Sequence, residues 1–153
     1  MTHHASTDPI REDHVHLLER VERLRATARQ LPALTEEQRR ALLEDLLSFL
    51  EGTLVPHARS EENVLYPEVA RLLGDPQATA PMTYDHVAIR DRIGEIAAAD
   101  ASDVPRLQEL LYGLHALITT HFWKEEELYL PLLDAGARPE VRQVLEVGAK
   151  LDL

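Results

Sequence analysis

The chain has 153 residues, enough for one domain with a substantial buried core, and it contains no cysteine. The lack of cysteine excludes disulfides, iron–sulfur clusters, thiolate-bound zinc and cysteine nucleophiles, so nitrogen and oxygen atoms must hold any metal. The net charge of −11 argues against a nucleic-acid partner, which usually meets a basic face. No leader segment and no apolar run of about 18 residues is recognisable, so we expect a cytoplasmic protein without a membrane partner.

Apolar residues recur at three- and four-residue spacing along most of the chain, which predicts amphipathic helices. The first helix covers residues 8–31 and opens with Asp8 as N-cap and a proline at the first helical position. Residues 32–35 break this helix. Thr35 and Gln38 predict a capping box that starts the second helix.

The second helix contains two prolines. Pro56 predicts a kink one turn before His57, because its ring crowds a carbonyl of the preceding turn and its nitrogen cannot donate. The helix continues past Pro67 to about Leu72 and ends at residues 74–76, Gly-Asp-Pro.

Two further long helices follow, from about residue 82 to residue 100 and from the start signal at residues 102–105 to residues 135–136. Residues 139–148 predict a short helix of weaker amphipathicity, and no segment has the period of a strand. The expected fold class is therefore all-α: an up-down-up-down antiparallel four-helix bundle with a short C-terminal fifth helix. We expect a single domain over residues 1–153, with the bundle at about 8–135 and the C-terminal helix at about 139–148.

The second and fourth helices repeat one motif. His57 and His121 are each followed four residues later by a glutamate, Glu61 and Glu125, and then by a second glutamate. At this spacing on an α-helix, an imidazole and a carboxylate lie about 40° apart around the axis and about 6 Å apart along it. Each pair can therefore reach a single ion.

The first and third helices each carry a further histidine on the apolar face, His14 and His86, preceded in both cases by an aspartate. The midpoint between His14 and His57 falls at the end of the break at residues 32–35, and the midpoint between His86 and His121 falls within residues 100–105. Antiparallel packing then brings the four histidines into one layer. The inward polar groups of that layer are His14, His57, Glu61, His86, His121 and Glu125.

Each of these residues also has an ordinary structural explanation. A lone histidine on an apolar face is usually a hydrogen-bonded core residue, and histidine–glutamate pairs are common on solvated helices. Two buried carboxylates without partners, however, would each cost several kcal/mol against a total stability of about 5–15 kcal/mol. Cations remove this cost, and six such groups suffice for two divalent ions. Spacing alone does not choose among iron, zinc, manganese and copper.

The order of a lone histidine, HxxxE, a lone histidine and HxxxE resembles the hemerythrin-like HHE cation-binding domain family over about Ile10 to Leu133. The resemblance implies two non-heme iron ions with an oxo or hydroxo bridge. In the corresponding positions His14 and His57 serve one iron, His86 and His121 the other, and both iron ions share the two carboxylates. Dioxygen, peroxide or nitric oxide is the implied small ligand.

The chain departs from many relatives at Arg90, where they place a further histidine or glutamate. A guanidinium cannot ligate a cation. Either one iron therefore keeps an exchangeable position, or Glu62 or Glu126 replaces the missing ligand. A related hypothesis is that Arg90 pairs with Glu62 or Glu126, and that Arg90→Glu tightens iron binding.

Two functions follow from the same centre. The first is a di-iron protein that binds or senses dioxygen or iron, and the alternative is an enzyme that decomposes peroxide or handles nitric oxide. The enzyme needs an open iron position and a proton donor nearby. A purely structural, metal-free bundle is the third interpretation, and the sequence does not indicate an oligomeric state.

The remaining polar and aromatic residues have ordinary expected roles. His16 and His115 lie off the apolar faces and are predicted at the surface. Trp123 is predicted at a helix or subunit contact. Boundary packing is favoured over ligand contact for the four tyrosines, which are Tyr66, Tyr84, Tyr112 and Tyr129.

Overall fold

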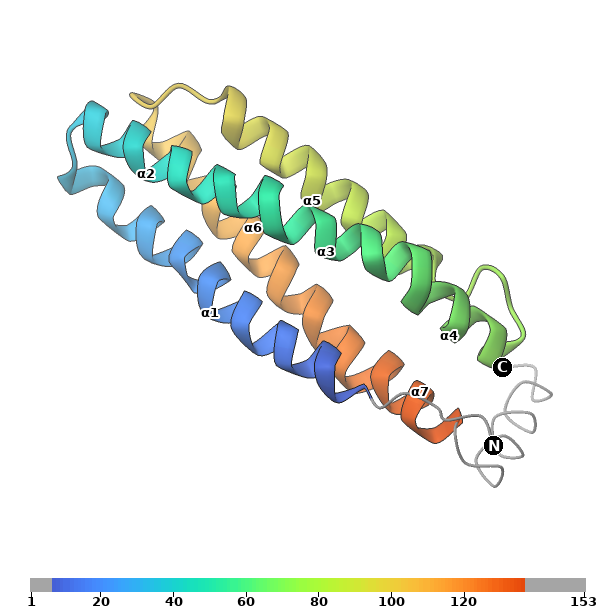
Figure 1. The fold of residues 1–153 in the computed structure, drawn as a ribbon. Helices are drawn as coiled ribbons and strands as arrows, with labels where there is room; N and C mark the ends of the chain where they lie inside the picture. Colours follow the sequence, from blue (N-terminus) through green and yellow to red (C-terminus); the bar gives the residue numbers. More distant parts are fainter. Residues whose placement is uncertain (1–6, 137–153) are drawn as a thin grey trace.

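A computed structural model of the chain describes residues 7–136, which form helices and short connections with no β-strand among them. Four helical rods lie side by side in antiparallel order (Figure 1), so the expected all-α, up-down-up-down bundle is confirmed. The fifth helix predicted at residues 139–148 lies outside the described residues.

Two of the rods are single α-helices and two are composite. The first rod is α1 (Asp8–Gln30), which ends in the 3₁₀ turn η1 (Leu31–Ala33), and the third rod is α5 (Ala80–Ala98). The second rod joins five segments: α2 (Glu36–Phe49), η2 (Leu50–Leu54), α3 (Val55–Ser60), η3 (Glu61–Leu65) and α4 (Tyr66–Leu73). The fourth rod joins α6 (Val104–Lys124), η4 (Glu125–Tyr129) and α7 (Leu130–Gly136). The segments η2, η3 and η4 are π-helical turns.

The rod ends carry the capping signals that the sequence predicts. The Thr35 hydroxyl accepts the backbone N–H of Gln38, and the Gln38 side chain accepts the N–H of Thr35, which completes the capping box. The second rod ends at Gly74, whose φ of 68° is left-handed. The first rod begins one residue earlier than expected, because Thr7 and not Asp8 is its N-cap residue.

A proline follows each π-helical turn. In η2, η3 and η4, the residue just before the next proline donates its N–H to the carbonyl five positions back. The wider turn makes room for the rings of Pro56, Pro67 and Pro131, none of which can donate. At Pro56, where the sequence predicts a kink, the helix thus accommodates the proline by a π-helical turn.

The polar layer divides the interior into two apolar parts. The larger core fills the end of the bundle that contains η1 and includes Leu24, Leu46, Leu107 and Leu114. A smaller cluster at the other end consists of Leu65, Tyr66, Met82 and Leu130. Packing of α1 against α6, α6 against α5, and α2 against α1 and α5 closes the interior from all sides.

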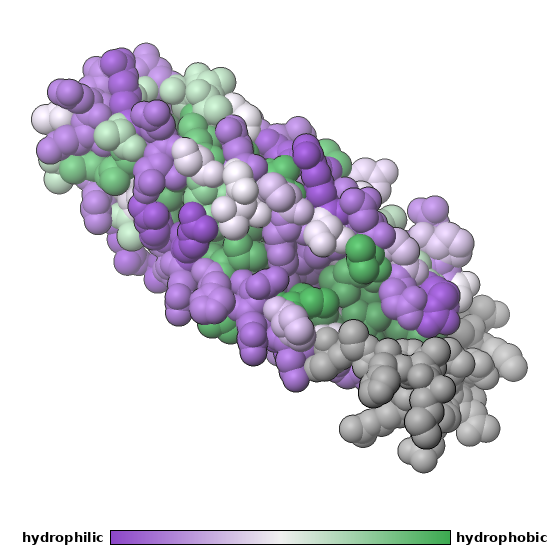
Figure 2. Space-filling model, viewed as in Figure 1, coloured by the Kyte–Doolittle hydropathy of each residue, from purple (hydrophilic) through white to green (hydrophobic). Residues whose placement is uncertain are grey.

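The outer surface is mostly hydrophilic in the face that Figure 2 shows, with hydrophobic side chains appearing mainly between the rods. None of the helices in residues 7–136 combines the length and the apolar character needed to cross a membrane.

Candidate metal centre

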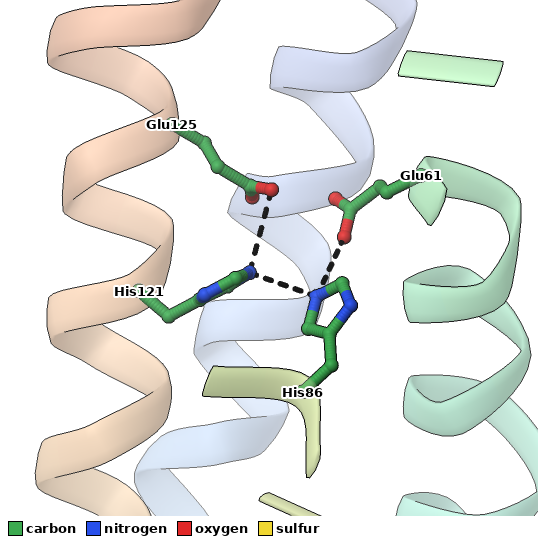
Figure 3. A group of neighbouring side chains, drawn as sticks. All are labelled: Glu61, His86, His121 and Glu125. Carbon is green, nitrogen blue, oxygen red and sulfur yellow. Dashed lines mark hydrogen bonds and ion pairs between the residues drawn. The ribbon is translucent and has the colours of Figure 1, made fainter. Parts of the chain in front are cut away.

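Six polar side chains from all four rods converge in the layer between the two apolar parts. His14 lies on α1, His57 on α3, His86 on α5 and His121 on α6, while Glu61 and Glu125 are the first residues of η3 and η4. All are buried except His57, whose side chain is 15% exposed. Two groups have donor atoms within 4.8 Å of one another: His14, His57 and Glu61 form the first, and Glu61, His86, His121 and Glu125 the second (Figure 3).

Glu61 lies between the two histidine pairs. Its Oε1 atom is 2.7 Å from Nε2 of His57 and 3.3 Å from Nε2 of His14. Its other oxygen, Oε2, is 3.3 Å from Nε2 of His86. One carboxylate therefore reaches imidazoles of both pairs.

Glu125 has the same relation to the two pairs from the opposite rod. Its Oε2 atom is 3.5 Å from Nε2 of His14, and its Oε1 atom is 3.3 Å from Nε2 of His121. The Nε2 atoms of His86 and His121 face each other at 2.9 Å (Figure 3). The four rings thus direct their Nε2 atoms at two carboxylates that lie between them.

Several donor atoms of the layer lack partners. Among the described residues, His57 Nε2, Glu61 Oε2 and Glu125 Oε2 are buried without a hydrogen bond. The 2.7 Å contact from His57 to Glu61 is thus close but not aligned as a hydrogen bond. Leaving such atoms unsatisfied costs about 1–3 kcal/mol each, and a cation among nitrogen and oxygen ligands would remove the cost. The residues therefore fit a metal.

The pKa shifts in the layer favour protonated histidines and ionised carboxylates. Burial would lower the pKa of His14 and His121, but hydrogen bonds and the charges of the neighbouring carboxylates raise both above 6.5. Burial would raise the pKa of Glu61, but the close ring nitrogens of His14, His57 and His86 hold it far below its usual range. Glu61 is therefore an anion that attracts either protonated rings or metal ions.

In three of the four rings, the Nδ1 atom, which points away from the centre of the layer, contacts a carboxylate. A basic side chain in turn forms an ion pair with that carboxylate. From ring to cation, these chains are His14–Glu126–Arg11, His86–Glu62–Arg90 and His121–Asp85–Lys124. The distances from ring Nδ1 to carboxylate are 2.6, 2.8 and 3.0 Å in that order. A hydrogen bond at Nδ1 leaves Nε2 free to bind a metal and fixes the direction of the ring.

The predicted pairing of Arg90 with a neighbouring glutamate occurs with Glu62, at 3.1 Å. Glu126 instead pairs with Arg11, at 2.5 Å. Both glutamates contact the outer nitrogen of a histidine, Glu62 that of His86 and Glu126 that of His14, so each supports a ring from behind. Asp85 has the same role and was not foreseen, although an aspartate precedes both His14 and His86.

Tyr66 lies at the centre of the layer, contrary to the expectation of boundary packing. Its hydroxyl donates to Oε1 of Glu125 at 2.7 Å and lies 3.2 Å from Nε2 of both His86 and His121. Burial, together with the charges of Glu125 and Glu61, raises the pKa of Tyr66, so its hydroxyl stays protonated. The only sequence signal was its position directly before Pro67.

The remaining expectations have mixed outcomes. His16 is exposed as predicted, and His115 binds Glu22 at 2.7 Å near the surface. Trp123 is 60% exposed within the described chain, so it is not packed between helices, and the alternative of a subunit contact stays a prediction. Tyr84 and Tyr112 are exposed, and Tyr129 donates to the carbonyl of Ala78.

A small enclosed cavity of about 10 Å³ adjoins the layer. Its volume corresponds to about one water-sized molecule. Apart from the ligand-type residues and Arg90, its walls are apolar: Leu54, Val55, Ala58, Ile89, Ile118 and Phe122.

The comparison with protein families agrees with this geometry. The family profile described as "Hemerythrin HHE cation binding domain" matches residues 5–133, which include all six inward residues. No curated protein and no solved structure matches the chain at a significant level. With its four-helix bundle and its buried histidine–glutamate cluster suited to a metal, the chain belongs to the hemerythrin HHE cation-binding domain family.

Proposed function

We propose that this chain holds two non-heme iron ions, joined by an oxo or hydroxo bridge, and binds or senses dioxygen or iron. His14 and His57 would hold one ion, and His86 and His121 the other. Glu61 and Glu125 would bridge the two ions. The observation that carries the proposal is that each carboxylate lies within 3.5 Å of an imidazole from both pairs.

The surroundings of the layer support a very small ligand. The enclosed cavity holds about one water-sized molecule between apolar side chains and the rings of His86 and His121. Phe122 stacks on His14 with ring centroids 4.5 Å apart and helps to exclude bulk water. A space of this size favours a very small ligand over an organic substrate.

Each component has a distinct chemical role in this proposal. Bound iron would supply the reducible centre that exchanges electrons with dioxygen. The imidazoles would bind through Nε2, and the carboxylates behind the rings of His14, His86 and His121 keep those three rings fixed. Tyr66 holds its proton and directs it at Glu125, 2.7 Å away.

The position of Tyr66 also favours the enzyme alternative, in which the same centre decomposes peroxide or handles nitric oxide. Such chemistry needs a proton donor close to the metals, and the Tyr66 hydroxyl lies within 3.2 Å of three of the proposed ligands. Rapid peroxide turnover by the iron-loaded protein that is lost in Tyr66→Phe would identify the enzyme.

Metal analysis combined with absorption spectroscopy tests the main proposal. We expect about two iron ions per chain and near-ultraviolet charge-transfer bands that change reversibly between reduced, deoxygenated protein and protein under air. Competition with zinc, manganese and copper determines the preferred metal. Protein that retains no metal from iron-replete cells would contradict the proposal and favour a purely structural bundle.

A further inference from the structure

The two halves of the metal centre differ in how firmly their ligands are held. We propose that the two metal positions are unequal: the ion between His86 and His121 is retained, and the ion between His14 and His57 exchanges through the side of the bundle between α1 and α3. This inference rests on the proposed two-metal function and concerns the order of loading and release.

At the retained position, both rings are fixed from behind. Glu62 accepts from His86 at 2.8 Å and is itself held by Arg90 at 3.1 Å. Asp85 contacts His121 at 3.0 Å and is held by Lys124. Partners of this kind change metal affinity by about 10–100-fold when they are removed, because they orient the ligand and raise its basicity.

At the exchangeable position, only one ring has such support. His14 is bound by Glu126, whereas the His57 ring contacts no carboxylate other than Glu61 within residues 7–136. The side chain of His57 is also 15% exposed, against 2% or less for the other three rings. His57 is therefore the ligand that can most easily turn away from its ion.

The repeat in the sequence explains the missing support. Asp85 precedes His86 and supports His121 on the neighbouring rod. Asp13 precedes His14 in the same way, so by the repeat it is the residue that would support His57. Lys124 anchors Asp85, but the residue three positions after His57 is Ser60, which has no charge. Asp13 is exposed and forms no hydrogen bond or ion pair with any described residue. The His57 ring thus lacks the carboxylate support that the other three rings have.

Solvent reaches His57 through two surface hollows. One has a volume of about 310 Å³ and is lined by Asp13, His16, Leu17, Arg20, Thr53 and His57. The other, of about 210 Å³, reaches both His57 and Glu61 past Ile10 and Val64. Each is many times larger than a water molecule, whereas the enclosed cavity beside Arg90 is about 10 Å³. A hydrated cation therefore has a route to His57.

Arg90 acquires a positioning role in this arrangement. It cannot bind a metal, but it holds Glu62, which orients His86. Removing this cation releases Glu62, so Arg90→Glu should loosen the retained ion. This is opposite in sign to the effect expected from the sequence.

Cobalt exchange tests the inference. Metal-free protein is loaded with two equivalents of Co²⁺, mixed with excess chelator, and followed by the visible d–d bands of cobalt and by metal analysis. We expect two phases of equal amplitude, the slow one at least about 10-fold slower than the fast one. His57→Ala should bind one Co²⁺ and release it at the slow rate. A single phase for both ions, or loss of both ions in His57→Ala, would overturn the inference.

Separate variants test the positioning role of Glu62 and Arg90. Glu62→Gln and Arg90→Leu should accelerate the slow phase by about 10–100-fold and leave the fast phase unchanged, while Arg90→Lys should restore most of the slow rate. Arg92→Leu is the matched control, because among residues 7–136 Arg92 pairs only with Glu95 on its own helix. Unchanged helix content by circular dichroism shows that each variant folds. A slow phase unaffected by Glu62→Gln would refute the role of Glu62 and Arg90.

These results separate the two proposals. Two cobalt ions with one common release rate contradict the inference and leave the two-metal function standing. Two release rates without any spectral response of the iron protein to dioxygen support the inference and contradict the dioxygen-binding part of the proposed function.

Discussion

The apolar core and the polar layer stabilise this bundle in different ways. In the core, leucines such as Leu24, Leu107 and Leu114 are fully buried and need no partner beyond one another. In the layer, Glu61 and Glu125 are as deeply buried, but their stability depends on positive charge between the rods. The comparison indicates that the core determines the fold, while the layer makes the free energy of unfolding depend on metal and protons.

Metal binding at the polar layer should produce the largest change in the free energy of unfolding. Zinc at about 1,000 times its dissociation constant should raise the free energy of unfolding by about 4 kcal/mol per site. Urea denaturation with and without zinc measures this change. His121→Ala, which removes one ligand of the position between His86 and His121, is expected to abolish the gain of that site, and an undiminished gain in that variant would contradict the proposed ligands.

The pH dependence of the free energy of unfolding should differ between the metal-free and the zinc-loaded protein. The raised pKa values of His14 and His121 contribute stability below pH 6.5 that is lost as pH rises through their folded-state values. The lowered pKa of Glu61 contributes stability above pH 4.5 that is lost as pH falls through its folded-state value. Metal-free protein should therefore become less stable above pH 6.5, whereas zinc-loaded protein should not, since metal ligands bind deprotonated. Denaturation curves from pH 6 to pH 9 that are parallel for both forms would contradict this explanation.

A core substitution should affect both forms equally. Leu114→Ala removes a fully buried side chain, so we expect a loss of about 2–5 kcal/mol with or without metal. Leu128→Ala, at a 53% exposed position, is the control and should change little. A loss that appears only in metal-free protein would mean that core and layer are not independent.

Tyr66→Phe tests the boundary between the two regions. The substitution keeps the ring in the smaller apolar cluster but removes the donor to Glu125. We expect a loss of about 1–3 kcal/mol in metal-free protein and a smaller loss after zinc loading. Tyr84→Phe, at an exposed tyrosine, provides the matched control for thermal denaturation.

The smallest effect is expected at the end of the second rod, far from the layer. Thr35→Ala removes the capping-box hydroxyl and should cost about 1 kcal/mol in both forms. Metal affinity should remain unchanged in this variant, which isothermal titration with zinc would verify. A change in affinity would show that the helix cap influences the layer.

The sequence predicted those features that depend on spacing along one helix. The rods, the Thr35 capping box, the stop at Gly74 and the shared layer of the histidines all follow from periodicity and turn residues. The neighbours behind the rings were harder to predict, since they lie on different rods. Glu126 meets His14 across 112 positions of sequence, and only the relative rotation of two helices determines that contact.

Tyr66 was missed for a related reason. It follows a π-helical turn, and a strict 3.6-residue period does not describe the direction of side chains across such a turn. For Trp123 the sequence left a helix contact and a subunit contact open, because hydrophobicity alone does not distinguish an aromatic side chain packed inside the chain from one on its surface.

The π-helical turns have a consequence for how this protein can evolve. Glu61 and Glu125 each begin a turn that holds more residues than an α-helical turn. A π-helical turn is an α-helical turn with one residue inserted, so deleting a single codon within η3 would restore the α-helical turn and let the residues on both sides keep their directions. Tyr66 could then stay in the layer with His57 and Glu61. A one-residue deletion in a purely α-helical segment would instead rotate everything downstream by about 100°.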